Sequence, residues 1–342
     1  MSLLFFIVAR YVPLEKGSQL LNEMKDASEI MARALGAIRE CREERGIAID
    51  RKTDVNETGM IGTESSPVTT SLGNLEAKRT TTNPDFAALV VYLLRRAGVR
   101  KGDAIAVGAS SSFPALIVAA LSASKAMGAR PLMITSLGAS QWGANLPNFH
   151  WLDMQDCLRK AGVFKTLPVA VSLGGENDTG LDLNPDSRAL LLRQAQERGM
   201  IILDEPDLRK NVQERMRLYG ENAGEEGIRA FINIGGSLAN MGRDSSILAL
   251  EPGLTAVRAI PSPEKRGVIH EMALKNVPVI HLLFVKGLVK SFKLPWDPTP
   301  FPHPGEGKIF LLARAGQASF LIVASVYFLF LVLVLLKGLR RC

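Results

Sequence analysis

The sequence is poor in the residues that build small metal or redox sites. It contains three cysteines in 342 residues, Cys41, Cys157 and Cys342, and none of them belongs to a CxxC pair or a Cys/His cluster. A structural zinc site is therefore not expected, because such a site needs clustered Cys and His ligands. Cysteines so few and so scattered also predict no disulfide scaffold. Cys342 could carry a lipid, although an unmodified cysteine is the simpler interpretation.

Aromatic residues and nucleotide-binding motifs are also scarce. Aromatics make up 6% of the chain, and although the net charge is +7, no block of Lys and Arg alternates with aromatic side chains. Nucleic acid is therefore not a predicted partner, and the charge better suits a membrane surface or an anionic substrate. Neither G-x-x-x-x-G-K-[ST] nor G-x-G-x-x-G occurs, so we expect neither ATP nor a dinucleotide and predict no cofactor.

The stretch from residue 103 to 145 predicts a βαβ unit. Two short apolar runs, 104–107 and 131–135, flank a helical stretch at 113–127, and each run ends in a loop of small residues. The carboxyl ends of neighbouring parallel strands meet at one edge of a sheet, where open α/β sheets bind ligands. We therefore expect the two loops, 108–112 and 136–145, to line one edge.

The rest of the chain continues this alternation. Further strands are expected at 167–172, 200–203, 228–234, 256–260 and 277–284, and helices at 83–97, 151–162, 187–198, 208–219 and 264–275. An amphipathic helix precedes them at 18–45, where Met24, Met31, Leu35 and Ile38 recur at three- and four-residue spacing. The pattern predicts an α/β fold with a mostly parallel, three-layer, Rossmann-like sheet domain.

The α/β domain is expected to span residues 18–293, after a short apolar segment at 1–17. Within it, residues 46–83 form a long polar loop, which either folds over the sheet edge and adds polar groups or is a solvated connector. Residues 294–314 carry five prolines and predict an extended linker.

The last part of the chain predicts a membrane anchor. The uncharged stretch from 315 to 336 would span about 33 Å as a helix, enough to cross a bilayer core. The basic tail, 337–342, contains Lys337, Arg340 and Arg341, while Lys308 and Arg314 precede the helix. The positive-inside rule then favours a cytoplasmic C-terminus. We predict a single-pass protein of the cell membrane with an extracytoplasmic domain.

The first small-residue loop allows three interpretations. Ser110 could be the nucleophile of a degenerate G-x-S-x-G turn, with Asp204 as acid and His270 as base. Alternatively, the hydroxyls of Ser110, Ser111 and Ser112 bind a carboxylate or phosphate with the N–H groups of the helix start. In the third, small residues allow a tight turn with Ser112 as helix cap. Anion binding is favoured, and catalysis by Ser110 or Ser111 with His270 remains an alternative.

The second small-residue loop combines amides with an exposed aromatic side chain, which is typical of a binding surface. The alternative is an ordered loop whose tryptophan covers the sheet edge. The predicted ligand-binding residues are Ser110, Ser111, Ser112, Ser140, Gln141, Trp142, Asn145, Lys78 and Arg79. No metal site is predicted, because Glu176 and Asp178 lack the spacing of a calcium loop.

Several long stretches are similar to one family. They are IGTESSPVTTSLGNLEAKRTTTNPDFAA (61–88), AVGASSSFPALIVAAL (106–121), SLGASQWGANLPNFHWLDM (136–154), VSLGGENDTGL (171–181) and FINIGGSLANMG (231–242). They resemble the poly-γ-glutamate system protein family, a membrane-associated component that accompanies the poly-γ-glutamate synthase in bacteria. The resemblance implies a role in making, exporting or anchoring this anionic polymer, with the synthase subunits, the polymer and membrane lipid as partners. It supplies no catalytic residues, and it attributes amide ligation to a separate, ATP-using subunit.

These observations lead to one main hypothesis and two alternatives. The main hypothesis is a membrane-anchored accessory protein that binds the polymer or the synthase through loops at the carboxyl edge of the sheet. The alternatives are a serine-dependent hydrolase or transferase acting on poly-γ-glutamate, and a structural scaffold of the membrane complex. The sequence favours a binding role over an enzymatic one.

Overall fold

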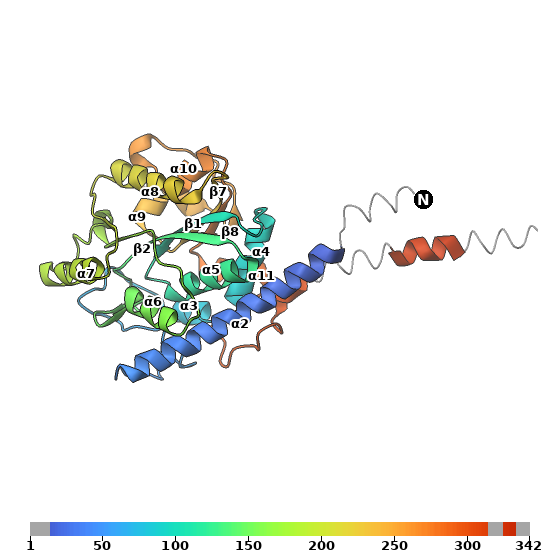
Figure 1. Ribbon diagram of the computed structural model, residues 1–342, viewed down its shortest axis with the longest axis horizontal. Helices are drawn as coiled ribbons and strands as arrows, with labels where there is room; N and C mark the ends of the chain where they lie inside the picture. The colour runs from blue at the N-terminus through green and yellow to red at the C-terminus, as the bar shows by residue number, and fades with distance from the viewer. Residues whose placement is uncertain (1–13, 314–323, 333–342) are drawn as a thin grey trace, which may run out of the picture.

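The structure is a computed structural model that describes residues 14–313 and 324–332 (Figure 1). Its centre is a seven-stranded sheet with the order β6-β5-β2-β1-β7-β9-β8. The strands are β1 (Ala104–Ser110), β2 (Arg130–Ser136), β5 (Ala170–Ser172), β6 (Ile202–Leu203), β7 (Ile228–Ile234), β8 (Gly253–Thr255) and β9 (Val279–Leu282). All neighbours are parallel except β8, which runs antiparallel to β9. The prediction of an α/β fold with a mostly parallel sheet is confirmed.

Helices cover both faces of the sheet (Figure 1). One face carries α2 (Leu14–Glu44), α4 (Asp85–Arg96), α5 (Pro114–Met127) and α6 (Trp151–Lys160), and the other carries α8 (Leu208–Ala223), α9 (Leu238–Met241) and α10 (Val268–Leu274). Side chains of a strand alternate between the two faces. Accordingly, Ile105 and Val107 of β1 join the core under α5, whereas Ala104 and Ala106 join the core under α8.

The βαβ unit forms because its helix suits a fully buried position. α5 is apolar on nearly all sides, begins with Pro114 in its first turn and ends at Gly128, which takes the left-handed conformation (φ 66°) of a helix C-cap. The register pairs Ser110 of β1 with Ser136 of β2, and Ser136 with Ser172 of β5. Three strands therefore end side by side, each on a serine.

Some segments differ from the sequence-based expectation. The strand expected at 256–260 is irregular, and the edge position is taken by β8 at Gly253–Thr255 instead. The long polar loop contains a helix, α3 (Leu75–Thr81), and residues 145–150 form a small hairpin of β3 (Asn145–Leu146) and β4 (Phe149–His150). The domain also contains the helices α7 (Pro185–Glu197) and α11 (Val285–Phe292).

The proline-rich segment is not an extended linker in its described part, 294–313. Ile309 and Phe310 are fully buried in the core formed with α2 and α4. Asp297 forms an ion pair with Arg79, and the carbonyl of Pro298 accepts a hydrogen bond from Asn56 (2.9 Å). The segment packs on the domain because its apolar side chains join the core beside α4.

The predicted terminal segments lie largely outside the described residues. Of the apolar segment at 1–17, residues 1–13 are not described, and α2 begins at Leu14. Of the membrane helix predicted at 315–336 and the basic tail at 337–342, only residues 324–332 are described, and they are helical. Among the described residues, no helix has the length and apolar character needed to cross a membrane.

Two of the cysteines are paired, contrary to the expectation that they make no disulfide scaffold. Cys41 of α2 and Cys157 of α6 form a disulfide across 116 residues of sequence, with their Cα atoms 5.9 Å apart. The sequence spacing gave no sign of it, because the two residues meet only once both helices pack on the same face of the sheet.

Candidate functional site

A cavity of about 390 Å³ opens at the carboxyl edge of the sheet. Ser110 and Ser136 line it from the ends of β1 and β2, and Gly174, Gly236 and Leu283 line it from the loops after β5, β7 and β9. From β1 the sheet continues to β2 and β5 on one side and to β7 and β9 on the other, so the cavity spans the point where the strand order reverses. Ligands of open α/β sheets bind at such a point.

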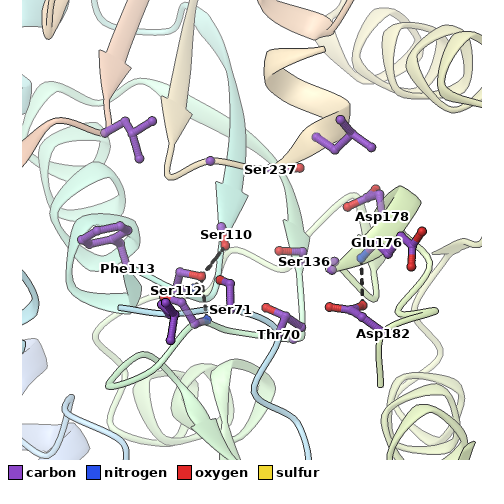
Figure 2. Close-up of a pocket in the computed structure, with 18 residues that line it drawn as sticks. Thr70, Ser71, Ser110, Ser112, Phe113, Ser136, Glu176, Asp178, Asp182 and Ser237 are labelled. Carbon is purple, nitrogen blue, oxygen red and sulfur yellow. Dashed lines mark hydrogen bonds between the residues drawn. The ribbon is translucent and has the colours of Figure 1, made fainter. Parts of the chain in front are cut away.

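The cavity has two walls of different chemistry (Figure 2). The hydroxyl wall consists of Thr70, Ser71, Ser110, Ser112 and Ser140, with the ring of Phe113 beside it. The acidic wall consists of Glu176, Asp178 and Asp182. Ser136 lies between them in Figure 2.

Hydrogen bonds hold the serines of the hydroxyl wall in place. The hydroxyl of Ser110 donates to the hydroxyl oxygen of Ser112 (3.0 Å), and the backbone N–H of Ser112 donates back to Ser110 Oγ (3.2 Å). The backbone N–H of Ser140 donates to Ser112 Oγ (2.9 Å). Because a hydroxyl both donates and accepts, this chain presents several hydrogen-bonding positions to the cavity.

Lys78 lies behind the hydroxyl wall and is almost fully buried. Its ammonium group donates to Ser140 Oγ (2.7 Å) and to the backbone carbonyl of Ser112, and it lies 3.9 Å from the centre of the Phe113 ring. Among the described residues no carboxylate pairs with it. Burial lowers the pKa of Lys78 to about 7, because the charged form loses its hydration.

The acidic wall is built on a short strained turn. Asn177 and Asp178 both have positive φ angles (51° and 65°), which non-glycine residues adopt at an energetic cost. Gly175 also has a positive φ (64°), and a Cβ atom there would lie 2.0 Å from Asp182 Oδ1. The close approach lets the backbone N–H of Glu176 donate to Asp182 Oδ1 (2.8 Å), which fixes the Asp182 carboxylate beside the backbone of Glu176.

The three carboxylates of the acidic wall differ in burial and in ion pairing. Asp178 is buried and forms an ion pair with the buried Arg215, supported by Ser172 (3.0 Å). Glu176 and Asp182 are exposed, and neither has an ion-pair partner in the described part of the chain. The described residues contain no cluster of three or more His, Cys, Asp or Glu side chains that could hold a metal ion. Glu176 and Asp182 therefore offer negative charge to a ligand.

Of the predicted site residues, Ser110, Ser112 and Ser140 line the cavity and Lys78 contacts two of them. Ser111 points elsewhere: it is fully buried, and its hydroxyl donates to the backbone carbonyl of Ser136.

Four other predicted residues do not line the cavity and instead hold neighbouring segments together. Asn145 is buried and bonds the backbone of Thr63 through both its oxygen (2.9 Å) and its nitrogen (2.8 Å). Gln141 Oε1 accepts from the N–H of Gly73 (3.1 Å). Trp142 is half-buried with a left-handed backbone (φ 63°), and its N–H donates to the carbonyl of Thr63 (2.9 Å). Arg79 forms the ion pair with Asp297, whose hydrogen bonds raise the pKa of Arg79.

The residues proposed for a serine triad are not brought together. His270 is buried in α10, where its Nδ1 accepts from the N–H of Gly267 (3.0 Å), and burial lowers its pKa. Asp204 is bound by Arg188 (2.6 Å). Neither residue lines the cavity that holds Ser110.

Sequence reasoning missed Thr70, Ser71 and Asp182 as lining residues. All three lie in segments without a periodic pattern, and nothing in their spacing marks them. From the sequence, Glu176 was considered only as a cation ligand, and that interpretation was set aside. The position of its loop directly after a buried strand was the signal that could have placed it at the cavity.

Comparisons with known proteins add little. No family model matches the chain, and no curated protein matches it. A solved structure, the α-aminoadipate aminotransferase of Thermus thermophilus, aligns at 14% identity and a TM-score of 0.18, and covers 84% of this chain and 56% of its own. The chain thus spans little more than half the length of that enzyme.

Proposed function

We propose that the protein is a membrane-anchored accessory component of bacterial poly-γ-glutamate synthesis or export, and that its cavity holds the amino-terminal end of the polymer. The observation that carries the proposal is that one cavity combines a hydroxyl wall with two carboxylates, Glu176 and Asp182, which have no ion-pair partner among residues 14–313 and 324–332. The stretches of sequence similar to the poly-γ-glutamate system family supply the choice of polymer.

The two walls match a zwitterion better than a uniform polyanion. The amino-terminal residue of a γ-linked glutamate chain carries an α-ammonium group and an α-carboxylate. The carboxylate can accept hydrogen bonds from Ser110 and Ser112, while the ammonium group pairs with Glu176 and Asp182. Residues in the middle of the polymer carry carboxylates only, and the acidic wall repels them.

The volume fits this assignment. A cavity of about 390 Å³ falls in the range of roughly 300–1,000 Å³ that holds small ligands, and it is too small for a long stretch of polymer. Ion pairs to exposed carboxylates are worth about 1 kcal/mol or less each, so two of them give a free amino end at most about thirtyfold higher affinity than a blocked one.

The disulfide supports the extracytoplasmic location proposed for the domain. Stable disulfides form in oxidising compartments and are rare in the cytosol. The Cys41–Cys157 bond and the basic residues at 337–342 are two independent observations. Each of them favours a domain on the outer side of the cell membrane.

Membrane lipid is proposed as a second partner, at the opposite edge of the sheet. A hollow there is lined by Arg95, Arg100, Lys101 and Arg229 beside the first turns of α2; Arg95 is paired with Glu23, and the other three supply the positive charge. Such a group of cations attracts anionic headgroups.

The test compares two ligands on the full-length chain in detergent micelles: a short γ-linked glutamate oligomer and its N-acetylated form. We expect the free γ-oligomer to bind up to about thirtyfold more tightly than the acetylated one. The double variant Glu176→Gln/Asp182→Asn, which keeps size and hydrogen bonding, should abolish that preference, whereas Asp186→Asn on the exposed surface of α7 should retain it. Equal binding of the free and acetylated oligomers, or none, contradicts the proposal. Retention of synthase subunits without any oligomer binding would favour a scaffold instead.

A further inference from the structure

The proposed binding function assigns no ligand contact to Lys78 or Ser140, yet these two side chains have the geometry of a reactive pair. Lys78 Nζ lies 2.7 Å from Ser140 Oγ, within the hydrogen-bond reach required of a base and its nucleophile. Ser140 lines the cavity, whereas Lys78 is buried behind it. A ligand can therefore contact the hydroxyl while the amine remains shielded from solvent.

We propose that Ser140 is a nucleophile and Lys78 its general base, and that the pair transfers the acyl group of an amide or ester bound in the cavity. Serine–lysine pairs are a known alternative to the serine–histidine–acid arrangement. The proposal concerns acyl chemistry in general and does not depend on the identity of the polymer.

The surroundings of Lys78 suit a base at neutral pH. Burial lowers the pKa of Lys78 to about 7, so the neutral amine and the ammonium form are both populated at neutral pH. The charged residues on the helices packed around α3 do not pair with it: these are Glu76 and Arg79 of α3 itself, Lys125 of α5, and Lys286 and Lys290 of α11. Arg79 is bound to Asp297.

The remaining contacts orient the pair. The backbone carbonyl of Ser112 accepts a hydrogen bond from Lys78, and the hydroxyl of Ser112 accepts one from the Ser140 N–H. Ser112 thus holds both members at once. The Lys78 amine lies on one side of Ser140 Oγ. The other side of that oxygen is turned to the cavity, where the carbonyl group of a ligand would lie.

The reaction balances with water as the co-reactant. Neutral Lys78 takes the proton of Ser140 as Oγ bonds to the carbonyl carbon. The tetrahedral intermediate collapses, the C–N or C–O bond breaks, and the Lys78 ammonium gives its proton to the leaving amine or alcohol. Lys78 then takes a proton from water as the oxygen of that water bonds to the acyl carbon. When the C–Oγ bond breaks, Lys78 returns the proton to Ser140, and the carboxylic acid leaves.

The test uses a fluorophosphonate probe on the full-length chain in micelles, with the labelled residue identified by mass spectrometry. We expect one adduct, on Ser140, formed about tenfold faster at pH 8 than at pH 6, because Lys78 must be neutral to act. Ser140→Ala should remove the adduct, and Lys78→Met should slow labelling at least about a hundredfold. Two matched controls should label normally: Lys125→Met, whose amine also bonds a carbonyl beside a phenylalanine ring, and Ser124→Ala, a buried serine of α5.

Three results would overturn the proposal: no adduct between pH 6 and 9, an adduct on a different residue, or normal labelling of Lys78→Met. If that variant fails to fold, the unmodified chain decides the question, since a flat pH profile or a midpoint near that of a solvated lysine, about 10.4, is incompatible with Lys78 as the base. The probe contains no glutamate, so failure of oligomer binding and failure of labelling are distinguishable.

Discussion

Removing the Cys41–Cys157 disulfide should destabilise the domain strongly. The bond closes a loop across 116 residues, and the chain-entropy relation for a loop of that size gives about 5 kcal/mol at 25 °C. Measured losses for native disulfides are about 2–5 kcal/mol. Folded-state contacts between these regions persist without the bond, because Arg45 of the segment after α2 still pairs with Asp153 of α6 (3.0 Å). Most of the loss of stability is therefore expected to arise from the higher conformational entropy of the unfolded chain without the crosslink.

The assay is urea unfolding of the double variant Cys41→Ala/Cys157→Ala against the unmodified chain, with and without reductant. With a slope of about 3 kcal/mol per M, the midpoint should fall by about 1 M, and the slope should rise because an uncrosslinked chain exposes more surface. Thiol titration of the denatured protein should find two more thiols after reduction than before. Coincident unfolding curves, or an unchanged thiol count, would refute both the bond and the reasoning.

Other predictions concern buried charges. Arg215→Met should cost about 3–5 kcal/mol, because it leaves Asp178 buried and unpaired. Adding Asp178→Asn should restore part of that loss in chemical denaturation. Burial raises the pKa of Asp85 to about 7, above the ordinary value of about 3.9, so the folded chain holds a proton that the unfolded chain releases. Stability should therefore fall as the pH rises from about 4 to 7 and then level off, relative to Asp85→Asn, which lacks this titration. Parallel stability curves for Asp85→Asn and the unmodified chain would contradict this account.

The sheet could be predicted because its signals are local. Short apolar runs bounded by glycine and small residues marked six of the seven strands near their observed places, and α5 between β1 and β2 fixed their parallel pairing. The edge strand β8 was missed because a three-residue antiparallel strand leaves almost no pattern. The expected strand at 256–260 was wrong because β-branched and apolar residues there meet no partner strand.

The contacts between distant segments could not be read from the sequence. Cys41 and Cys157 meet only because α2 and α6 share one face of the sheet, and Ile309 is buried only because the proline-rich segment returns to α4. Asp85 shows the same limit: Gly307 packs so closely on it that a Cβ there would lie 1.9 Å from Asp85 Oδ2. Asp85 is the first residue of α4, a position where aspartate is common, and the packing of the distant Gly307 contributes to its burial.

The polar stretch at 46–83 decides what the site can do. The strand ends alone would supply Ser110 and Ser136, which are common small residues in a tight turn. The polar stretch crosses the carboxyl edge and adds Thr70 and Ser71 to the cavity, anchored by the hydrogen bond from Thr70 N–H to the carbonyl of Ala139 (2.9 Å). Its helix α3 then places Lys78 against Ser140. The groups that distinguish this cavity from an ordinary sheet edge therefore come from the part of the chain with the weakest structural signal, which explains why the fold could be predicted while the arrangement of its chemistry could not.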